Sequence, residues 1–151
     1  MTISVQLETR IARPVPDVFG ALIDIESYPT WLVASGITRV ELLDTAPLHA
    51  GSRLRIGQTV AGRSTVLDGI VTVLAPGAAF GIRGKDREGI SIDIDTVVAP
   101  DEMSTRLRWS LRIGLPLRYR LFESMVAPQA RQAAAVDLDA FRRRLETPIA
   151  G

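Results

Sequence analysis

Strand-like alternation runs from residue 37 to residue 113 with few helical periods, and one long helical segment, Pro116 to Glu146, follows it. An antiparallel sheet with one solvated face must cover its other, apolar face with a second element. The C-terminal segment is the only one large enough, since roughly twenty helical residues at about 1.5 Å each reach about 30 Å. The pattern therefore predicts an α+β chain in which one helix covers an antiparallel sheet.

The first part of the chain supplies one further strand and two short helices. Residues 3–11 alternate between apolar and polar side chains, which is typical of a half-buried strand. Apolar residues at helical spacing then run from 15 to 23, with Pro16 and Asp17 at the start, as a helix N-terminus favours. A second short helix is expected over residues 25–32. A length of 151 residues fits one domain, residues 1–151.

Two turn signals predict how neighbouring strands pair. Pro76-Gly77 favours a type II turn. The resulting pairs are Val73–Phe80, Val71–Ile82 and Asp68–Lys85. A turn at Pro100-Asp101 predicts a second register. Its pairs are Asp95–Arg106, Asp93–Arg108, Ile94–Leu107, Ile92–Trp109 and Thr96–Thr105. Together these registers give the sheet one charged face and one apolar face.

The composition leaves few residues for catalysis or metal binding. The chain has no cysteine and one histidine, His49, which excludes thiolate and multi-histidine metal sites within one chain. Its one lysine, Lys85, lies in a polar loop, a poor place for the desolvated amine that Schiff-base chemistry needs. We therefore expect no metal and no cofactor, and the catalytic residues, if there are any, stay unknown.

Two side chains are nevertheless candidates for proton transfer. Asp68 is the carboxylate nearest the middle of the predicted sheet and the first choice for a general acid. The predicted pairing places it on the outer face instead, between Arg55 and Lys85. His49, in the loop before the third strand, is the candidate general base.

The charge pattern gives no reason to expect a nucleic acid or a membrane as a partner. The formal net charge is +1, and the one basic run, Arg142 to Arg144, falls where the dipole of the last helix favours cations. The longest uncharged stretch, residues 69–82, is interrupted by Pro76-Gly77 and is shorter than the roughly 18 residues of a membrane span. We expect no membrane insertion and a cytoplasmic location; the oligomeric state is not predicted.

Several segments resemble a known family. They are residues 11–19, residues 24–32, Leu48 to Ser52 before the third strand, Ser104 to Trp109, and Asp137 to Glu146. In these segments the chain resembles the SRPBCC superfamily, the polyketide cyclase/dehydrase and lipid-transport group related to START domains and the birch-pollen allergen. The resemblance implies a helix-grip fold, in which a curved seven-stranded antiparallel sheet surrounds a long C-terminal helix and an apolar cavity. It implies no single reaction, because fold and function separate in such groups.

The C-terminal helix predicts where that cavity would lie. Its last turns carry Leu138 and Phe141, whereas its earlier turns carry Ala130, Ala133 and Ala134. Small residues facing a concave sheet leave space for a ligand; close backbone packing is the alternative. The residues expected to line the cavity are Trp31, Ile56, Gln58, Val71, Phe80, Ile92, Ile94, Thr96, Thr105, Leu107, Trp109, Phe122, Val126, Ala130, Ala133 and Ala134.

Some of these residues have more specific expected roles. Gln58, the two threonines and the Trp109 indole are the polar groups on the inner face, where each needs a partner or a ligand. Trp31 either lines the cavity mouth or plugs the joint between the short helices and the sheet. Residues 114–128 are expected to form a mobile entrance, the alternative being an ordinary connection.

These expectations favour one function over two others. The leading hypothesis is binding or transport of a hydrophobic small molecule such as a lipid, an isoprenoid or a polyketide. The second is an enzyme, a polyketide aromatase/cyclase or dehydratase, which requires an ionisable group inside the cavity. The third is a co-chaperone-like interaction module whose cavity is filled by side chains.

Overall fold

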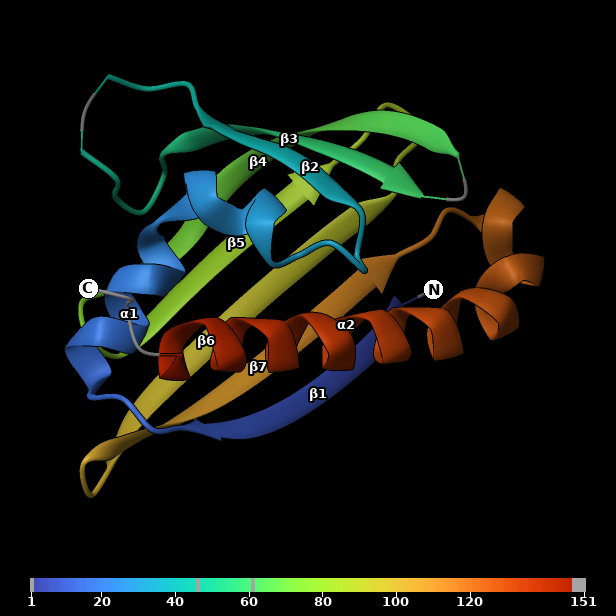
Figure 1. Ribbon diagram of the computed structural model, residues 1–151. Coiled ribbons are helices and arrows are strands. Elements are labelled where there is room, and N and C mark those ends of the chain that lie inside the picture. The colour runs from blue at the N-terminus through green and yellow to red at the C-terminus, as the bar shows by residue number, and fades with distance from the viewer. Residues whose placement is uncertain (1, 46, 61, 148–151) are drawn as a thin grey trace.

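Seven strands form one antiparallel sheet in the computed structural model, which describes residues 2–45, 47–60 and 62–147. The sheet order is β1-β7-β6-β5-β4-β3-β2, and it curves around the C-terminal helix (Figure 1). The strands are β1 (Thr2–Ile11), β2 (Ile37–Leu42), β3 (Arg53–Val60), β4 (Arg63–Ala75), β5 (Ala79–Lys85), β6 (Ser91–Asp101) and β7 (Ser104–Gly114). This is the predicted α+β helix-grip architecture.

The helices lie on the concave side of the sheet. Two short ones, α1 (Val15–Ile23) and the 3-10 helix η1 (Ile25–Thr30), follow β1 and lie at one end of the sheet (Figure 1). The predicted helix over 116–146 is divided into the 3-10 helix η2 (Leu117–Phe122) and α2 (Glu123–Glu146). Pro128 lies inside α2, where its missing N–H removes one helical hydrogen bond. No helix of the described residues is long and apolar enough to cross a membrane.

The β4–β5 hairpin follows the predicted turn but not the whole predicted register. Gly77 has a φ of 70°, and Ala78 N donates to Ala75 O at 2.9 Å, as a type II turn requires. Val71–Ile82 and Asp68–Lys85 pair as predicted. A shift between Val71 and Val73 then pairs Val73 with Gly81, so the predicted Val73–Phe80 pair is wrong. The extra residue turns Val73 outward, where it is 41% exposed.

The predicted β6–β7 register is wrong by four residues. Asp101 pairs with Ser104, so the turn falls at Glu102-Met103, where Glu102 has a φ of 58°. Pro100 stays in β6 because no described strand pairs with it on the β5 side. The last residue of β6 that pairs with β5 is Val97, so Pro100 needs no N–H there. The observed pairs are Thr96–Trp109, Asp95–Ser110, Ile94–Leu111, Asp93–Arg112 and Ile92–Ile113. Because four is an even number, each side chain keeps its predicted face.

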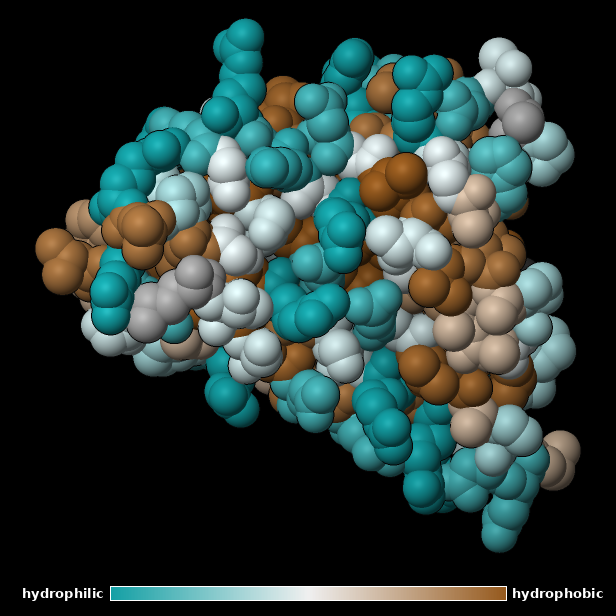
Figure 2. All heavy atoms as spheres, turned by 180° about the vertical axis from the view of Figure 1, so that it is seen from behind, coloured by the Kyte–Doolittle hydropathy of each residue, from teal (hydrophilic) through white to brown (hydrophobic). Residues whose placement is uncertain are grey.

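The outer face of the sheet is charged but not uniformly so. Asp93 forms its ion pair with Arg83, at 2.6 Å, rather than with Arg108 as predicted. Exposed apolar side chains such as Ile70 and Val97, 41% and 49% exposed, lie among the charges. Figure 2 shows the molecule from behind, with hydrophilic and hydrophobic side chains mixed on this face.

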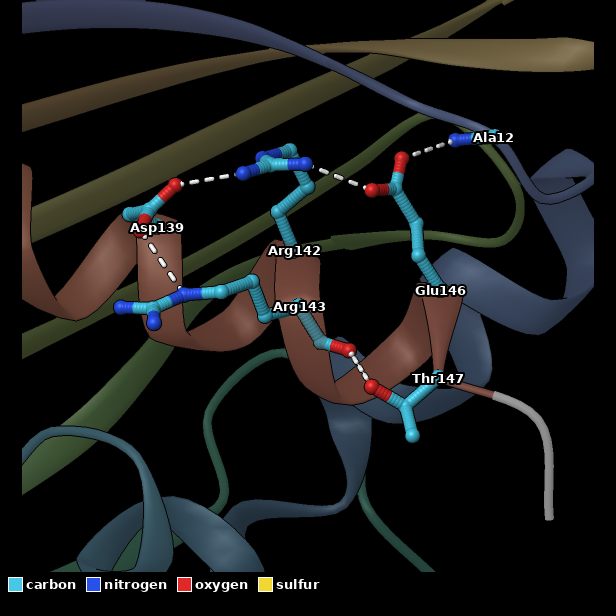
Figure 3. Close-up of polar contacts among 6 residues, drawn as sticks. All are labelled: Ala12, Asp139, Arg142, Arg143, Glu146 and Thr147. Carbon is cyan, nitrogen blue, oxygen red and sulfur yellow. Dashed lines mark hydrogen bonds and ion pairs between the residues drawn. The ribbon is translucent and has the colours of Figure 1, made fainter.

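The C-terminal end of α2 is anchored to the opposite end of the chain. Glu146 accepts a hydrogen bond from Ala12 N at 2.8 Å and one from the Arg142 guanidinium at 2.6 Å (Figure 3). Arg142 and Arg143 both pair with Asp139, one turn earlier on the same helix. These two arginines of the basic run are therefore neutralised within α2.

An aromatic cluster fills the core beneath this anchored end. The rings of Trp31 and Phe141 are 4.6 Å apart, and those of Trp31 and Trp109 are 5.8 Å apart. Tyr28 packs edge-on against Trp31 and donates its hydroxyl to the Leu22 carbonyl. Trp31 is 2% exposed, so it plugs the joint between the short helices and the sheet.

A substitution of Gly36 tests the tight approach of the segment before β2 to β3. Gly36 has a φ of 77°, and a Cβ there would lie 2.0 Å from the Thr59 carbonyl oxygen. G36A should lower the free energy of unfolding by about 3 kcal/mol or more, measured by urea denaturation. Gly77 also has positive φ, but a Cβ there meets nothing within 4 Å, so G77A should cost only about 1–2 kcal/mol. Equal losses would contradict the close approach.

Tyr28 predicts a loss of stability in alkali. Burial, with the charge of Asp24 as a smaller cause, raises the pKa of Tyr28 above its ordinary value. The contribution of Tyr28 to the free energy of unfolding is fully present below the pKa of about 10 that tyrosine has in the unfolded chain. It is lost as the pH rises above that value, because the tyrosine then ionises in the unfolded chain but not in the folded one. Urea midpoints at pH 8 and 10.5 should therefore fall more steeply for the wild type than for Y28F. Parallel slopes would show that Tyr28 is not responsible.

Candidate functional site

The two ends of α2 pack differently against the sheet. At the C-terminal end Leu138 and Phe141 are 5% and 1% exposed and belong to the closed core. Toward the N-terminal end Ala130, Ala133 and Ala134 face a cavity of about 240 Å³. The cavity lies between α2, the strands β3, β6 and β7, and the segment that leads into β2. The size contrast along one helix face therefore leaves a pocket toward the N-terminal end of α2.

The structure brings together part of the predicted cavity lining. Those predicted residues that do line the pocket are Gln58, Ile92, Ile94, Trp109, Val126, Ala130, Ala133 and Ala134. They come from β3, β6, β7 and α2. The inward-facing side chains of the three strands and the alanines of α2 therefore border the same cavity.

The other predicted lining residues lie outside the pocket. Trp31, Ile56, Val71, Phe80 and Leu107 are buried in the closed core. Phe122 is 51% exposed at the end of η2.

The two threonines of the inner face have protein partners. The Thr96 hydroxyl donates to the Phe80 carbonyl at 3.1 Å, and the Thr105 hydroxyl donates to the Arg13 carbonyl at 2.8 Å. Both are satisfied core hydroxyls rather than pocket groups.

One wall of the pocket was not foreseen from the sequence. It is the segment between η1 and β2, which contributes Leu32, Ala34 and Ser35, together with Ile37, the first residue of β2. Asp137, buried in α2, holds it in place: its two carboxylate oxygens accept the N–H groups of Ala34 and Ser35, each at 2.8 Å. Gln129, Val60, Leu111 and Ile113 also line the pocket. The alternation of β7 would have identified Leu111 and Ile113; nothing local identifies the segment that Asp137 holds.

The pocket wall carries few polar groups. Gln58 is half-buried, and its Nε2 donates to the Ser35 carbonyl at 3.0 Å. The indole nitrogens of Trp31 and Trp109 are both buried without an acceptor among the described residues. Trp109 therefore presents ring carbons rather than its N–H to the cavity. None of the described lining residues is acidic or basic.

The candidate proton-transfer residues lie away from the pocket. Asp68 is exposed on the outer face, paired in register with Arg55 and Lys85 as predicted. The Nδ1 of His49 lies 2.7 Å from Ser52 Oγ within an exposed loop. Neither side chain faces the cavity.

A second depression, of about 540 Å³, lies on the outer side at the β3–β4 and β5–β6 connections. It is open and lined largely by charged and polar side chains, among which Arg63 pairs with Glu88 at 2.5 Å. Hydrogen bonding from Tyr119, followed by the bond from Arg63, holds the pKa of Glu88 below its ordinary value. This depression is an open, charged part of the surface, so the apolar pocket under α2 is the better site candidate.

The chain matches a known protein family over almost its whole length. Residues 2–146 match the family model described as polyketide cyclase / dehydrase and lipid transport. No curated protein matches the sequence.

Solved structures share the fold at low sequence identity. The Zhui aromatase/cyclase from Streptomyces sp. R1128 matches with a TM-score of 0.77 at 16% identity, over 97% of this chain and 94% of that one. A START superfamily protein from Mycobacterium smegmatis matches with a TM-score of 0.71 at 22% identity, over 95% and 97%. Ara h 8.0201 matches with a TM-score of 0.70 at 12% identity, over 96% and 98%. At these identities the likeness concerns the fold alone.

Removing the Asp137 carboxylate tests how the segment before β2 is held. D137A should lower the free energy of unfolding by about 2–3 kcal/mol and speed amide hydrogen exchange at Ala34 and Ser35. D139A is the matched control two residues along α2: its ion pairs are solvent-exposed, so it should cost under about 1 kcal/mol and leave those two amides unchanged. Unchanged exchange in D137A would show that the segment is held by other contacts.

Proposed function

Since the chain belongs to the polyketide cyclase / dehydrase and lipid transport family, we propose that it binds or carries a hydrophobic small molecule in the pocket under α2. One observation carries the proposal: a cavity of about 240 Å³ has apolar walls and no acidic or basic side chain among its described lining residues. A pocket of this kind favours apolar ligands with one or two polar groups.

The buried area available to such a ligand supports a useful affinity. A molecule that buries about 300 Å² of apolar surface gains roughly 7 kcal/mol at about 25 cal/mol per Å². Before the costs of association, this gain corresponds to a dissociation constant in the micromolar range. This gain comes from apolar burial and involves no charged contact.

An aromatase/cyclase or dehydratase is the second candidate, because the family description also covers cyclases and dehydrases. Such an enzyme would fold its substrate in the same pocket and move protons with an ionisable group. The described lining offers Gln58, Gln129, Ser35 and Trp109, none of which is a general acid or base near neutral pH. Binding without chemistry therefore fits the lining better. A co-chaperone-like module, the third hypothesis, would need the cavity filled by side chains.

A bulky residue in the pocket wall should abolish binding. Ile92 lines the cavity on β6, so I92W fills space that the ligand needs. The probe is 2-methoxynaphthalene, which is uncharged and has no hydrogen-bond donor. Its binding is measured by equilibrium dialysis. The wild type should bind it saturably with a micromolar dissociation constant, and I92W should bind at least about tenfold more weakly.

The matched control makes the same exchange on the other face of the sheet. Ile70 is 41% exposed on β4 and does not line the pocket, so I70W should bind like the wild type. Circular dichroism confirms that both variants are folded. A wild type that does not bind the probe, or an I92W that binds as well as I70W, would overturn the proposal.

A further inference from the structure

Gln58 gives the apolar pocket one oriented polar group. Its Nε2 donates to the Ser35 carbonyl, and a carbonyl oxygen can only accept, so this bond establishes which end of the amide is the NH₂. The Oε1 accepts no hydrogen bond from any described residue. Gln58 lines the cavity, and its Oε1 and second Nε2 hydrogen have no partner among the described residues.

The amide is held in this orientation by a chain of hydrogen bonds. Gln58 is attached to Ser35, whose own N–H donates to the buried Asp137 carboxylate at 2.8 Å. Asp137 also accepts from Ala34 N, so the carbonyl that positions Gln58 belongs to a segment fixed at two adjacent residues. An oriented acceptor costs a ligand less ordering than a freely rotating one.

The charges around the pocket disfavour an anion. None of the described lining residues carries a positive charge, so a carboxylate would lose its hydration without a counter-ion. The charged group bonded directly to the wall is Asp137, which is itself acidic and bonds Ala34 and Ser35. The missing counter-ion and the nearby acidic group both lower the affinity of the pocket for an anion.

We propose that the pocket selects an uncharged ligand bearing a hydroxyl group, which donates to Gln58 Oε1, and that it rejects carboxylates of the same size. A hydroxyl both donates and accepts, so it matches the free Oε1 and the second Nε2 hydrogen better than a carbonyl or an ether does. This inference rests on the proposed function of the pocket and names the ligand class that it takes.

Three probes of one ring system separate these effects: 2-naphthol, 2-methoxynaphthalene and 2-naphthoate, each measured by equilibrium dialysis at pH 7. The naphthol should bind about five- to tenfold more tightly than the ether, which lacks the donor. The naphthoate, which is ionised at this pH, should bind at least about tenfold more weakly than the ether.

Q58L removes the acceptor and keeps an apolar side chain of similar length. It should weaken naphthol binding about five- to tenfold and leave the ether within about twofold of the wild type. Q6L is the matched control, since Gln6 is an exposed strand glutamine on β1 that does not line the pocket. It should change neither affinity more than about twofold. Thermal unfolding confirms that both variants are folded.

The outcomes separate the two proposals. If the ether binds but the naphthol binds no more tightly, or the naphthoate binds as well as the naphthol, the hydroxyl inference fails and the pocket remains a binding site. If Q58L keeps the preference for naphthol, the assignment to Gln58 is wrong. If none of the three probes binds, the proposed function fails as well.

Discussion

The packing of α2 against the concave face of the sheet determines the rest of the structure. At its C-terminal end Phe141 lies 4.6 Å from Trp31, ring centre to ring centre, and Glu146 accepts from Ala12 N at 2.8 Å. A helix held at one end keeps its distance from the sheet along its length. Where the helix carries the small side chains of Ala133 and Ala134, the space between helix and sheet is left as a cavity of about 240 Å³. The cavity thus follows from a tight end and a small-residue end on the same helix.

The pocket wall is built by two kinds of interaction. The sheet side comes from apolar residues such as Ile92 and Ile94, whose positions follow from strand alternation. The segment before β2 is instead positioned by polar contacts, from Asp137 and Gln58 to Ser35. The buried Asp137 carboxylate accepts hydrogen bonds from this segment and does not line the cavity. This division supports a site that holds a neutral molecule rather than one that moves protons.

The sequence predicts the sheet, its covering helix and the cavity walls made of regular elements. The alternation of strand residues and the spacing of helix residues can be read from neighbours along the chain. For this reason Gln58, Trp109 and Ala133 could be identified as cavity-lining residues from the sequence. The β6–β7 turn could not be predicted, because Glu102 takes a positive φ that glycine or asparagine normally marks. The shift in β4 after Val71 has no local signal either. The segment held by Asp137 depends on hydrogen bonds across more than a hundred residues, which no pattern along the chain reveals.

The most direct test of this account is native mass spectrometry of the freshly purified protein, under conditions that preserve noncovalent complexes. We predict a second species heavier than the apoprotein by the mass of one small molecule, which organic extraction releases as an uncharged, mostly apolar compound with a hydroxyl group. The same species should be absent from I92W and present in I70W. A protein that carries no such mass and also takes up none from a hydrophobic extract of its host cells would contradict the central claim.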